Sequence, residues 1–133
     1  MTTLVFQGQG SQYVGMSKDF YDNFVSARDI FDKVENATNI KVKDIIFENK
    51  GNFLDITKYT QLSIFTASMA IFRVFKKVFK DTHFANINFV LGHSLGEYSA
   101  LTASKSISIK NCAMLLKIRG ELMQNAYPEN ESG

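Results

Sequence analysis

The chain contains 133 residues, of which 45% are hydrophobic and 21% are charged, and its formal net charge is +2. This length fits one domain or a piece of one, the apolar fraction excludes wholesale disorder, and the small positive excess gives no argument for a nucleic-acid partner. A single cysteine excludes a disulfide framework, and two histidines leave little room for a metal site.

The first half of the chain is expected to form a strand followed by helices. Thr3–Phe6 is short, apolar and ends in a glycine-containing loop, which predicts a buried strand. Ser17 is expected to cap a helix that reaches about residue 37, because apolar residues recur there every three or four positions. A short helix is expected over residues 42–48 and a longer one over residues 60–80.

The second half repeats the change from strand to helix. Residues 87–91 predict a second strand, residues 92–96 turn it into a helix to about residue 103, and Ser108 is expected to cap a last helix to about residue 126. This order predicts the α/β class, with a parallel sheet flanked by helices. Because two parallel strands leave both sheet edges unpaired, we expect the chain to be the front portion of a larger domain. The alternative is that the chain contains further strands that its sequence pattern does not reveal.

Residues 92–96, Gly-His-Ser-Leu-Gly, match the G-x-S-x-G pattern of a nucleophile elbow. In such an elbow the serine, here Ser94, sits on a sharp turn from strand to helix with its hydroxyl exposed. The N–H of Leu95 then points to where an oxyanion would form, and the helix amino terminus adds positive potential. The alternative is an ordinary turn whose serine caps the helix.

A nucleophilic serine needs a base, and the sequence does not supply one. His93 is adjacent to Ser94, so its side chain is expected to diverge and to pack or hydrogen-bond within the turn. His83 precedes the second strand and is expected at the strand's opposite end. No histidine follows Ser94, although α/β-hydrolases place theirs after the serine.

The loop after the first strand, residues 8–12, contains two glycines. A dinucleotide fingerprint would need glycine where Tyr13 stands, and a P-loop would need lysine where Met16 stands, so both phosphate-binding interpretations fail. The loop shares the carboxyl edge of the sheet with Ser94 and could offer a second N–H to an oxyanion. The alternative is a glycine turn that only reverses the chain.

A helical wheel places Arg119 near the middle of the apolar face of the last helix. The apolar residues of that face are Ile109, Cys112, Ala113, Leu115, Leu116, Leu122 and Met123. A buried guanidinium needs a partner, and its planar fork suits a carboxylate from the protein or from a ligand. The alternatives are a structural salt bridge and a side chain that extends past the edge of the core.

The remaining features concern the surface and location of the protein. The basic cluster Arg73, Lys76, Lys77 and Lys80 is interpreted as a solvated face near the end of the long helix, with docking of an acidic partner as the alternative. No apolar run reaches the roughly 18 residues of a membrane span, and the first residues do not resemble a signal peptide. We therefore expect a cytoplasmic protein with no membrane partner.

Three motifs together resemble the malonyl-CoA:acyl carrier protein transacylase family. They are residues 8–12 (GQGSQ), residues 92–97 (GHSLGE) and residues 118–124 (IRGELMQ), in the family's order and at family-like spacing. The resemblance implies a hydrolase-like α/β core that holds a smaller ferredoxin-like subdomain. Residues 1–133 would be the N-terminal part of this acyltransferase domain, ending before the subdomain and the catalytic histidine.

The resemblance implies a role for each matching residue. Ser94 would attack the malonyl thioester and become the acyl-enzyme, while the N–H groups of Gln9 and Leu95 hold the oxyanion. Arg119 would pair with the free carboxylate of malonyl, and Gln61 and His93 would lie at the substrate site. Coenzyme A enters as the thioester substrate, acyl carrier protein accepts the acyl group for fatty acid biosynthesis, and no cofactor or metal is implied.

The sequence has no histidine after Ser94 to act as its base, and this lowers the activity that we expect of the chain. We expect the chain alone to be nearly inactive, because removing the base of a serine nucleophile costs on the order of 10⁴–10⁶ in kcat. The alternatives are a serine esterase or thioesterase that uses the same elbow, a non-catalytic remnant, and half of a split enzyme whose second chain supplies the missing part.

Overall fold

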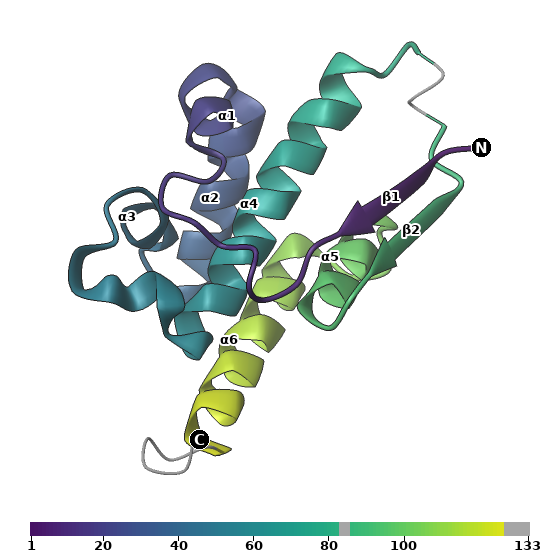
Figure 1. Ribbon diagram of the computed structural model, residues 1–133. Coiled ribbons are helices and arrows are strands. Elements are labelled where there is room, and N and C mark those ends of the chain that lie inside the picture. The colour runs from purple at the N-terminus through teal and green to yellow at the C-terminus, as the bar shows by residue number, and fades with distance from the viewer. Residues whose placement is uncertain (83–85, 127–133) are drawn as a thin grey trace.

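The computed structural model describes residues 1–82 and 86–126 as a small parallel sheet with helices packed beside it, which confirms the predicted α/β class (Figure 1). In chain order the elements are β1 (Thr3–Phe6), α1 (Lys18–Asn23), α2 (Val25–Thr38), α3 (Val42–Phe47), the 3-10 helix η1 (Lys50–Asp55), α4 (Thr57–Val78), β2 (Phe89–Gly92), α5 (Leu95–Ala103) and α6 (Ile109–Ala126). Within the described ranges, no helix combines the length and apolarity needed to cross a membrane.

The two strands pair in parallel, with Thr3 opposite Phe89 and Phe6 opposite Gly92. Side chains alternate between the two faces of the sheet. Phe6 is buried on one face, where its ring meets the Phe72 ring of α4 edge-on at 5.9 Å. The opposite face carries Val5, whose residue surface is 65% exposed, so helices cover the sheet on one side only.

Helix α4 is the centre of the hydrophobic core. It packs against α2 and α6, which also pack against each other, and it contacts α5 (Figure 1). Its fully buried residues include Leu62 and Phe65, which pack in one cluster with Phe31 of α2 and Leu116 of α6. Both α5 and α6 pack on α4, and α5 also contacts the two strands. Helix α4 therefore fixes the position of α6 relative to the carboxyl edge of the sheet.

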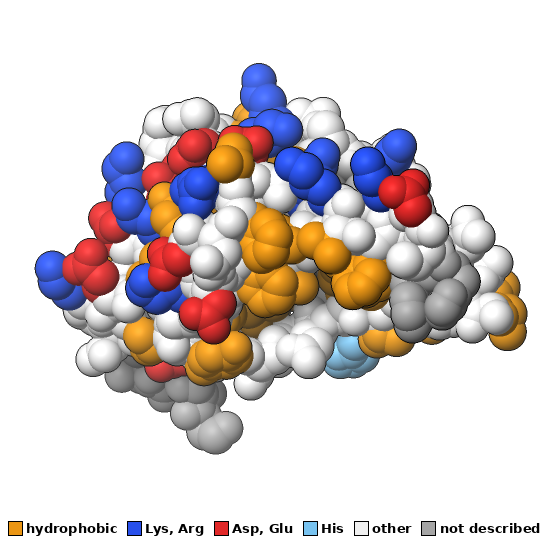
Figure 2. Space-filling model, turned by 90° about the horizontal axis from the view of Figure 1, so that it is seen from above, with side chains coloured by type: hydrophobic (Ala, Val, Ile, Leu, Met, Phe, Trp, Pro, Cys, Tyr) orange, Lys and Arg blue, Asp and Glu red, His pale blue; other side chains and the backbone are white. Residues whose placement is uncertain are grey.

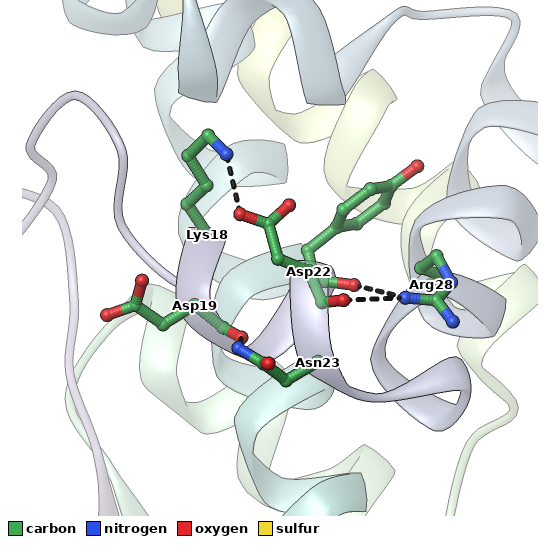
Figure 3. Close-up of polar contacts among 6 residues, drawn as sticks. Lys18, Asp19, Asp22, Asn23 and Arg28 are labelled. Atoms are coloured by element: carbon green, nitrogen blue, oxygen red, sulfur yellow. Dashed lines mark hydrogen bonds and ion pairs between the residues drawn. The ribbon is translucent and has the colours of Figure 1, made fainter.

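The single helix predicted over residues 17–37 is wrong, because it is two helices. Phe24 adopts an extended conformation (φ −130°, ψ 121°) between α1 and α2. Arg28 satisfies the carbonyls freed at this break, since its Nη1 donates to the backbone oxygens of Tyr21 at 2.7 Å and Asp22 at 3.2 Å (Figure 3). The side chain of Asn23 donates to the Asp19 carbonyl in the same way, at 2.8 Å.

The two predicted serine caps have opposite outcomes. Ser17 stands before α1 in the left-handed conformation (φ 62°) and its side chain caps nothing, so that prediction is wrong. A Lys18–Asp22 ion pair at 2.6 Å braces this first helix instead (Figure 3). Ser108 does cap α6, because its Oγ accepts the N–H of Asn111 at 3.1 Å.

The buried face of α6 is narrower than its apolar residues suggest. Ile109, Cys112, Ala113 and Leu116 are buried as predicted. Leu115 and Leu122 are 47% and 65% exposed, so the prediction that they join the core is wrong. Lys117 lies beside the buried face and donates to the Thr38 carbonyl at the end of α2.

The basic cluster lies at the surface, as predicted. Arg73, Lys76, Lys77 and Lys80 are all exposed in the last turns of α4 and just beyond it. Figure 2 shows the molecule from above, with apolar side chains near the centre of this face and Lys and Arg side chains, mixed with Asp and Glu, along its upper and left margins. Exposure of this kind fits a solvated face.

At Gly120 the backbone of α6 lies close to the backbone of α4. A Cβ placed on Gly120 would lie 2.8 Å from the Cα of Lys58, which is backbone and cannot move aside. The first turn of α4 can therefore approach α6 this closely only because Gly120 has no side chain.

We expect Gly120→Ala to destabilise the chain, against the usual helix preference. Alanine gains about 1 kcal/mol of helix propensity over glycine, whereas a steric overlap in a packed interface costs about 1–3 kcal/mol. Urea unfolding followed by circular dichroism measures the difference. Asn36→Ala, on an exposed position of α2, is the matched control and should change the unfolding free energy by less than about 0.5 kcal/mol. A Gly120→Ala protein as stable as the parent would contradict the close approach.

Candidate active site

Ser94 occupies the sharp turn that the motif predicts. It joins β2 to α5 with φ 53° and ψ −111°, a region that non-glycine residues rarely adopt and that costs about 1–3 kcal/mol. Its side chain makes no cap to the helix, which argues against the alternative of a simple capping serine. The residue is exposed, so its hydroxyl is open to a substrate.

Glycines on both sides of Ser94 make the turn possible. A Cβ on Gly92 would lie 2.0 Å from the carbonyl oxygen of Gly96, and one on Gly96 would lie 2.3 Å from the carbonyl oxygen of Phe6. The start of α5 therefore touches the end of β1 backbone to backbone. Gly8 makes a similar contact, because its Cβ would lie 2.8 Å from the carbonyl oxygen of His93.

The loop of residues 8–12 consequently lies against the elbow. Internal bonds hold it, since the Gly10 N–H donates to Gln12 Oε1 at 2.9 Å and the Ser11 hydroxyl donates to the Gly8 carbonyl at 2.8 Å. Gln9 donates from its side chain to Thr57 Oγ1 at 3.3 Å, at the start of α4. Among the described residues, neither the Gln9 nor the Leu95 backbone N–H has an acceptor, and Leu95 itself is fully buried.

Arg119 reaches Ser94 from α6. Its Nη2 donates to Ser94 Oγ at 3.2 Å, and its Nη1 donates to Oε1 of Gln61. The guanidinium carbon also lies 5.3 Å from the centre of the Tyr98 ring, within cation–π range. Three elements, α4, α5 and α6, thus fix the position of one cation beside the serine.

The hydrogen-bond partners of Arg119 are not the carboxylates expected for a buried guanidinium. The side chain is half-buried at the edge of the packed face of α6 rather than at its middle. Across residues 1–82 and 86–126, its hydrogen-bond acceptors are uncharged and no carboxylate pairs with it. The alternative of a structural salt bridge is therefore not found among these residues.

Gln61 is fully buried and joins Arg119 to the end of α6. Its Oε1 accepts from Arg119, and its Nε2 donates to Met123 Sδ at 3.1 Å. Both ends of the amide are used, so the orientation of this side chain is set. The structure places Gln61 next to the candidate site.

His93 is exposed, and its backbone carbonyl accepts the Gly96 N–H at 2.9 Å within the turn. Its Nδ1 lies 3.8 Å from a Cβ built on Gly8, on the side of the glycine loop. Within the described part of the chain, its imidazole makes no hydrogen bond to Ser94. His83, expected far from the serine, lies outside the described residues.

Tyr98 and Met123 lie beside Arg119 and Gln61, and the sequence analysis did not predict that either residue is near the candidate site. Tyr98 follows Ser94 by four residues, so helical spacing alone would have put both on one face of α5. Met123 follows Arg119 by four residues on α6 and was counted only as an apolar core residue. The i, i+4 relation was the available signal in both cases.

Cys112 is buried where α6 meets α5, and it is not a competing nucleophile. It is buried, and its Sγ lies 3.7 Å from the Tyr98 carbonyl oxygen. Burial raises the pKa of the thiol, more than a hydrogen bond with Thr102 lowers it. The reactive thiolate is therefore disfavoured.

A groove on the described part of the chain lies away from Ser94. It measures about 950 Å³ and is lined by the amino-terminal half of β2, the second half of α4, the end of α5 and the start of α6. Ser94 is at the opposite end of α5, whose nine residues span about 13 Å. No group of three metal-ligating side chains is found in the described ranges.

The chain is similar to known acyltransferases over nearly all of its length. The acyl transferase domain model matches residues 3–133. The malonyl CoA-acyl carrier protein transacylase of Bacillus subtilis (strain 168) is 36% identical over 127 residues, covering 96% of this chain and 38% of the relative. The acyl-carrier-protein-S-malonyltransferase of Bartonella henselae superposes with a TM-score of 0.88 at 42% identity, covering 96% of this chain and 41% of that chain. A malonyl-transacylase in complex with its type II PKS acyl-carrier protein gives 0.87 at 34% identity, covering 96% and 40%.

A parallel sheet whose second strand turns through G-x-S-x-G into a helix defines an α/β protein with a nucleophile-elbow motif. The chain belongs to the acyl transferase domain family. It spans about two fifths of the length of the relatives that it matches.

We expect Cys112 to react slowly with iodoacetamide at pH 8 while the chain is folded. The thiol is buried and its pKa is raised, so alkylation requires local opening of α6 from α5. Mass spectrometry at timed intervals, in buffer and in denaturing urea, gives the two rates. The folded rate should be lower by at least about tenfold, which an opening free energy of about 1.4 kcal/mol produces. Equal rates would show that the thiol is accessible in the folded state.

Proposed function

We propose that the chain carries the nucleophile and the substrate-recognising part of an acyltransferase that moves malonyl from coenzyme A to acyl carrier protein in fatty acid biosynthesis. The contact between the Arg119 guanidinium and the Ser94 hydroxyl supports this most directly. In a malonyl thioester the two carbonyl carbons are separated by two C–C bonds, or about 2.5 Å. A cation next to the attacking oxygen is therefore well placed for the far carboxylate.

The reaction proceeds in two transfers. Ser94 Oγ gives its proton to a base and attacks the thioester carbon, the C–S bond breaks, and the leaving sulfur takes that proton from the base, so that coenzyme A departs as the thiol. The thiol of the carrier protein then gives its proton to the base and attacks the serine ester, the ester C–O bond breaks, and the serine oxygen takes the proton from the base. In both steps the oxyanion is held by the N–H groups of Gln9 and Leu95 and by the amino terminus of α5.

Arg119 distinguishes malonyl from acetyl. Its two hydrogen-bonding nitrogens form a fork suited to a carboxylate, and Gln61 and Tyr98 hold that fork in place. The malonyl carboxylate would replace the Ser94 hydroxyl as the acceptor of Nη2, which frees the hydroxyl for attack. Acetyl has no group to offer the guanidinium. His93 stands at the rim of the same site, beside the glycine loop.

The partner that accepts the acyl group is an acyl carrier protein. The support is the similarity to a malonyl-transacylase that was solved in complex with its acyl-carrier protein. No cofactor enters the scheme, since coenzyme A is part of the substrate.

The base is supplied from outside the described residues. No imidazole or carboxylate among them contacts Ser94, and the relatives contain more than half of their length beyond the matched region. The base therefore comes from a polypeptide equivalent to that remaining part, on a second chain or in continuation of this one. Alone, the described residues retain only the slow reaction that oxyanion stabilisation and binding support.

Hydrolysis by an esterase or thioesterase is the competing function, favoured by the open access of water to Ser94. Malonyl-CoA and acetyl-CoA offered with a carrier protein separate the two. Transfer that depends on the carrier supports the transacylase, and indiscriminate release of free acid supports the hydrolase. If the completed domain carries out neither reaction, the chain is a non-catalytic remnant.

A slow malonyl adduct on Ser94 is the expected result when the chain is incubated with malonyl-CoA. Intact-mass and peptide mass spectrometry locate the adduct. Ser94→Ala should abolish it, whereas Ser104→Ala, an exposed serine at the end of the same helix, should leave it unchanged. An adduct that survives in Ser94→Ala would assign the nucleophile elsewhere.

Arg119→Ala should remove the preference of Ser94 for malonyl-CoA over acetyl-CoA. Loss of a desolvated charge partner costs about 2–5 kcal/mol, or roughly 30- to 4,000-fold in the ratio of acylation rates. The ratio is measured from adduct formation with each thioester. Lys110→Ala removes an exposed cation from the same helix and should preserve the preference. Unchanged selectivity in Arg119→Ala would remove Arg119 from the carboxylate site.

A further inference from the structure

Met123 ends a line of hydrogen bonds that begins at Ser94. Arg119 donates from Nη2 to Ser94 Oγ at 3.2 Å and from Nη1 to Gln61 Oε1, and Gln61 Nε2 donates to Met123 Sδ at 3.1 Å. A thioether sulfur is a weak acceptor, whereas the other acceptors in this line are oxygens. The sulfur is also the member of the line that a mild oxidant can change.

Met123 is open to solvent. Its exposed fraction is 38%, close to the 44% of Met114 on the same helix, whereas Met16 and Met69 are buried in the core. An oxidant dissolved in water reaches an exposed thioether before a buried one, so Met123 and Met114 are expected to react ahead of the two core methionines. At about 100° per residue, Met114 falls on the opposite side of α6 from Met123 and is therefore a natural control.

Gln61 has no freedom to accommodate a sulfoxide in place. The 3.1 Å between Met123 Sδ and Gln61 Nε2 is already a hydrogen-bond distance, so an oxygen bonded to the sulfur on this side would overlap the amide. An oxygen on the other side still makes the side chain polar and chiral next to that amide. Because Gln61 is fully buried and has no water to turn to, its amide must follow the new acceptor, and its Oε1 then leaves Arg119.

Arg119 keeps two of its three contacts when Gln61 moves. The Ser94 hydroxyl still accepts from Nη2, and the Tyr98 ring still faces the guanidinium. Loss of the Nη1 acceptor therefore turns the fork rather than removing the cation. Because bidentate pairing with a carboxylate depends on the plane of the fork, this rotation weakens recognition of a thioester that carries a free carboxylate.

We propose that Met123 is a reversible oxidation site that lowers the selectivity of Ser94 for malonyl through Gln61 and Arg119. The Sδ lone pair attacks one oxygen of hydrogen peroxide, the O–O bond breaks, and a proton moves to the departing oxygen. The thioether thus loses two electrons and becomes a sulfoxide, while the peroxide becomes water; a methionine sulfoxide reductase returns the electrons. Met123 is a positioning residue in this scheme. The inference rests on the proposed function, since it concerns the choice between malonyl and acetyl.

The first measurement follows the oxidation without any thioester. The chain is treated with hydrogen peroxide, and peptide mass spectrometry gives the oxidation rate of each methionine. Met123 and Met114 should react at least about tenfold faster than Met16 and Met69, which require local opening of the core. The side-chain amide signals of Gln61, identified in heteronuclear NMR spectra by their loss in Gln61→Glu, should shift in step with oxidation of Met123.

Two variants each retain one of the exposed methionines of α6. Met123→Leu keeps Met114, Met114→Leu keeps Met123, and leucine nearly conserves the side-chain volume in both. Peroxide should shift the Gln61 signals in the parent and in Met114→Leu but not in Met123→Leu. Each protein is compared with its own untreated sample, and all of them retain Cys112, so oxidation of the thiol cannot produce the difference.

Selectivity is the ratio of the rates at which malonyl-CoA and acetyl-CoA form the Ser94 adduct. Oxidation should lower this ratio by at least about fivefold in the parent and in Met114→Leu, because one hydrogen bond to a charged group is lost. The ratio should not change on oxidation of Met123→Leu. Treatment of the oxidised parent with the two methionine sulfoxide reductases, one for each epimer, should restore the starting ratio.

The outcomes separate this inference from the proposed function. Gln61 signals that do not respond to oxidation of Met123, a ratio that falls equally in Met123→Leu, or a parent ratio that oxidation leaves unchanged would each overturn the inference. An untreated chain that forms no malonyl adduct would instead remove the proposed function, and the Gln61 signals would still decide whether oxidation of Met123 moves the amide.

Discussion

Backbone contact at the carboxyl edge of the sheet is the constraint on which the site depends. Gly96 allows the first turn of α5 to rest on the last carbonyl of β1, and Gly92 allows the elbow to close on itself. Any side chain at either position would push the helix from the strand and move Ser94 with it. The strain at Ser94 is held by these contacts, which leave no room for the turn to relax.

A second close approach sets the position of the cation. Gly120 brings α6 against Lys58 at the start of α4, and the neighbouring Arg119 is thereby within reach of Gln61 on α4 and Ser94 before α5. The guanidinium is anchored by neutral acceptors and an aromatic ring, so its charge is positioned without being neutralised. Such an arrangement suits recognition of an anionic ligand better than a salt bridge would.

The proposed chemistry is divided between this part of the domain and the rest. The described residues hold the hydroxyl, the two N–H groups without an acceptor and the cation, all close to one sheet edge. The base is a separate requirement, because a strained elbow cannot place its own adjacent histidine on the serine.

The sequence by itself determined the α/β class, the two strands, the elbow at residues 92–96 and the Ser108 cap, because each depends on neighbours within a few positions. It also singled out Arg119, since a cation within an apolar pattern needs a partner. Tertiary structure alone decided that this partner is Gln61, 58 residues away, that Phe24 breaks the first helix, and that Leu115 and Leu122 remain in water. The physical reason is the range of the interaction: caps and turns are satisfied locally, whereas burial and side-chain pairing depend on which distant segments pack together.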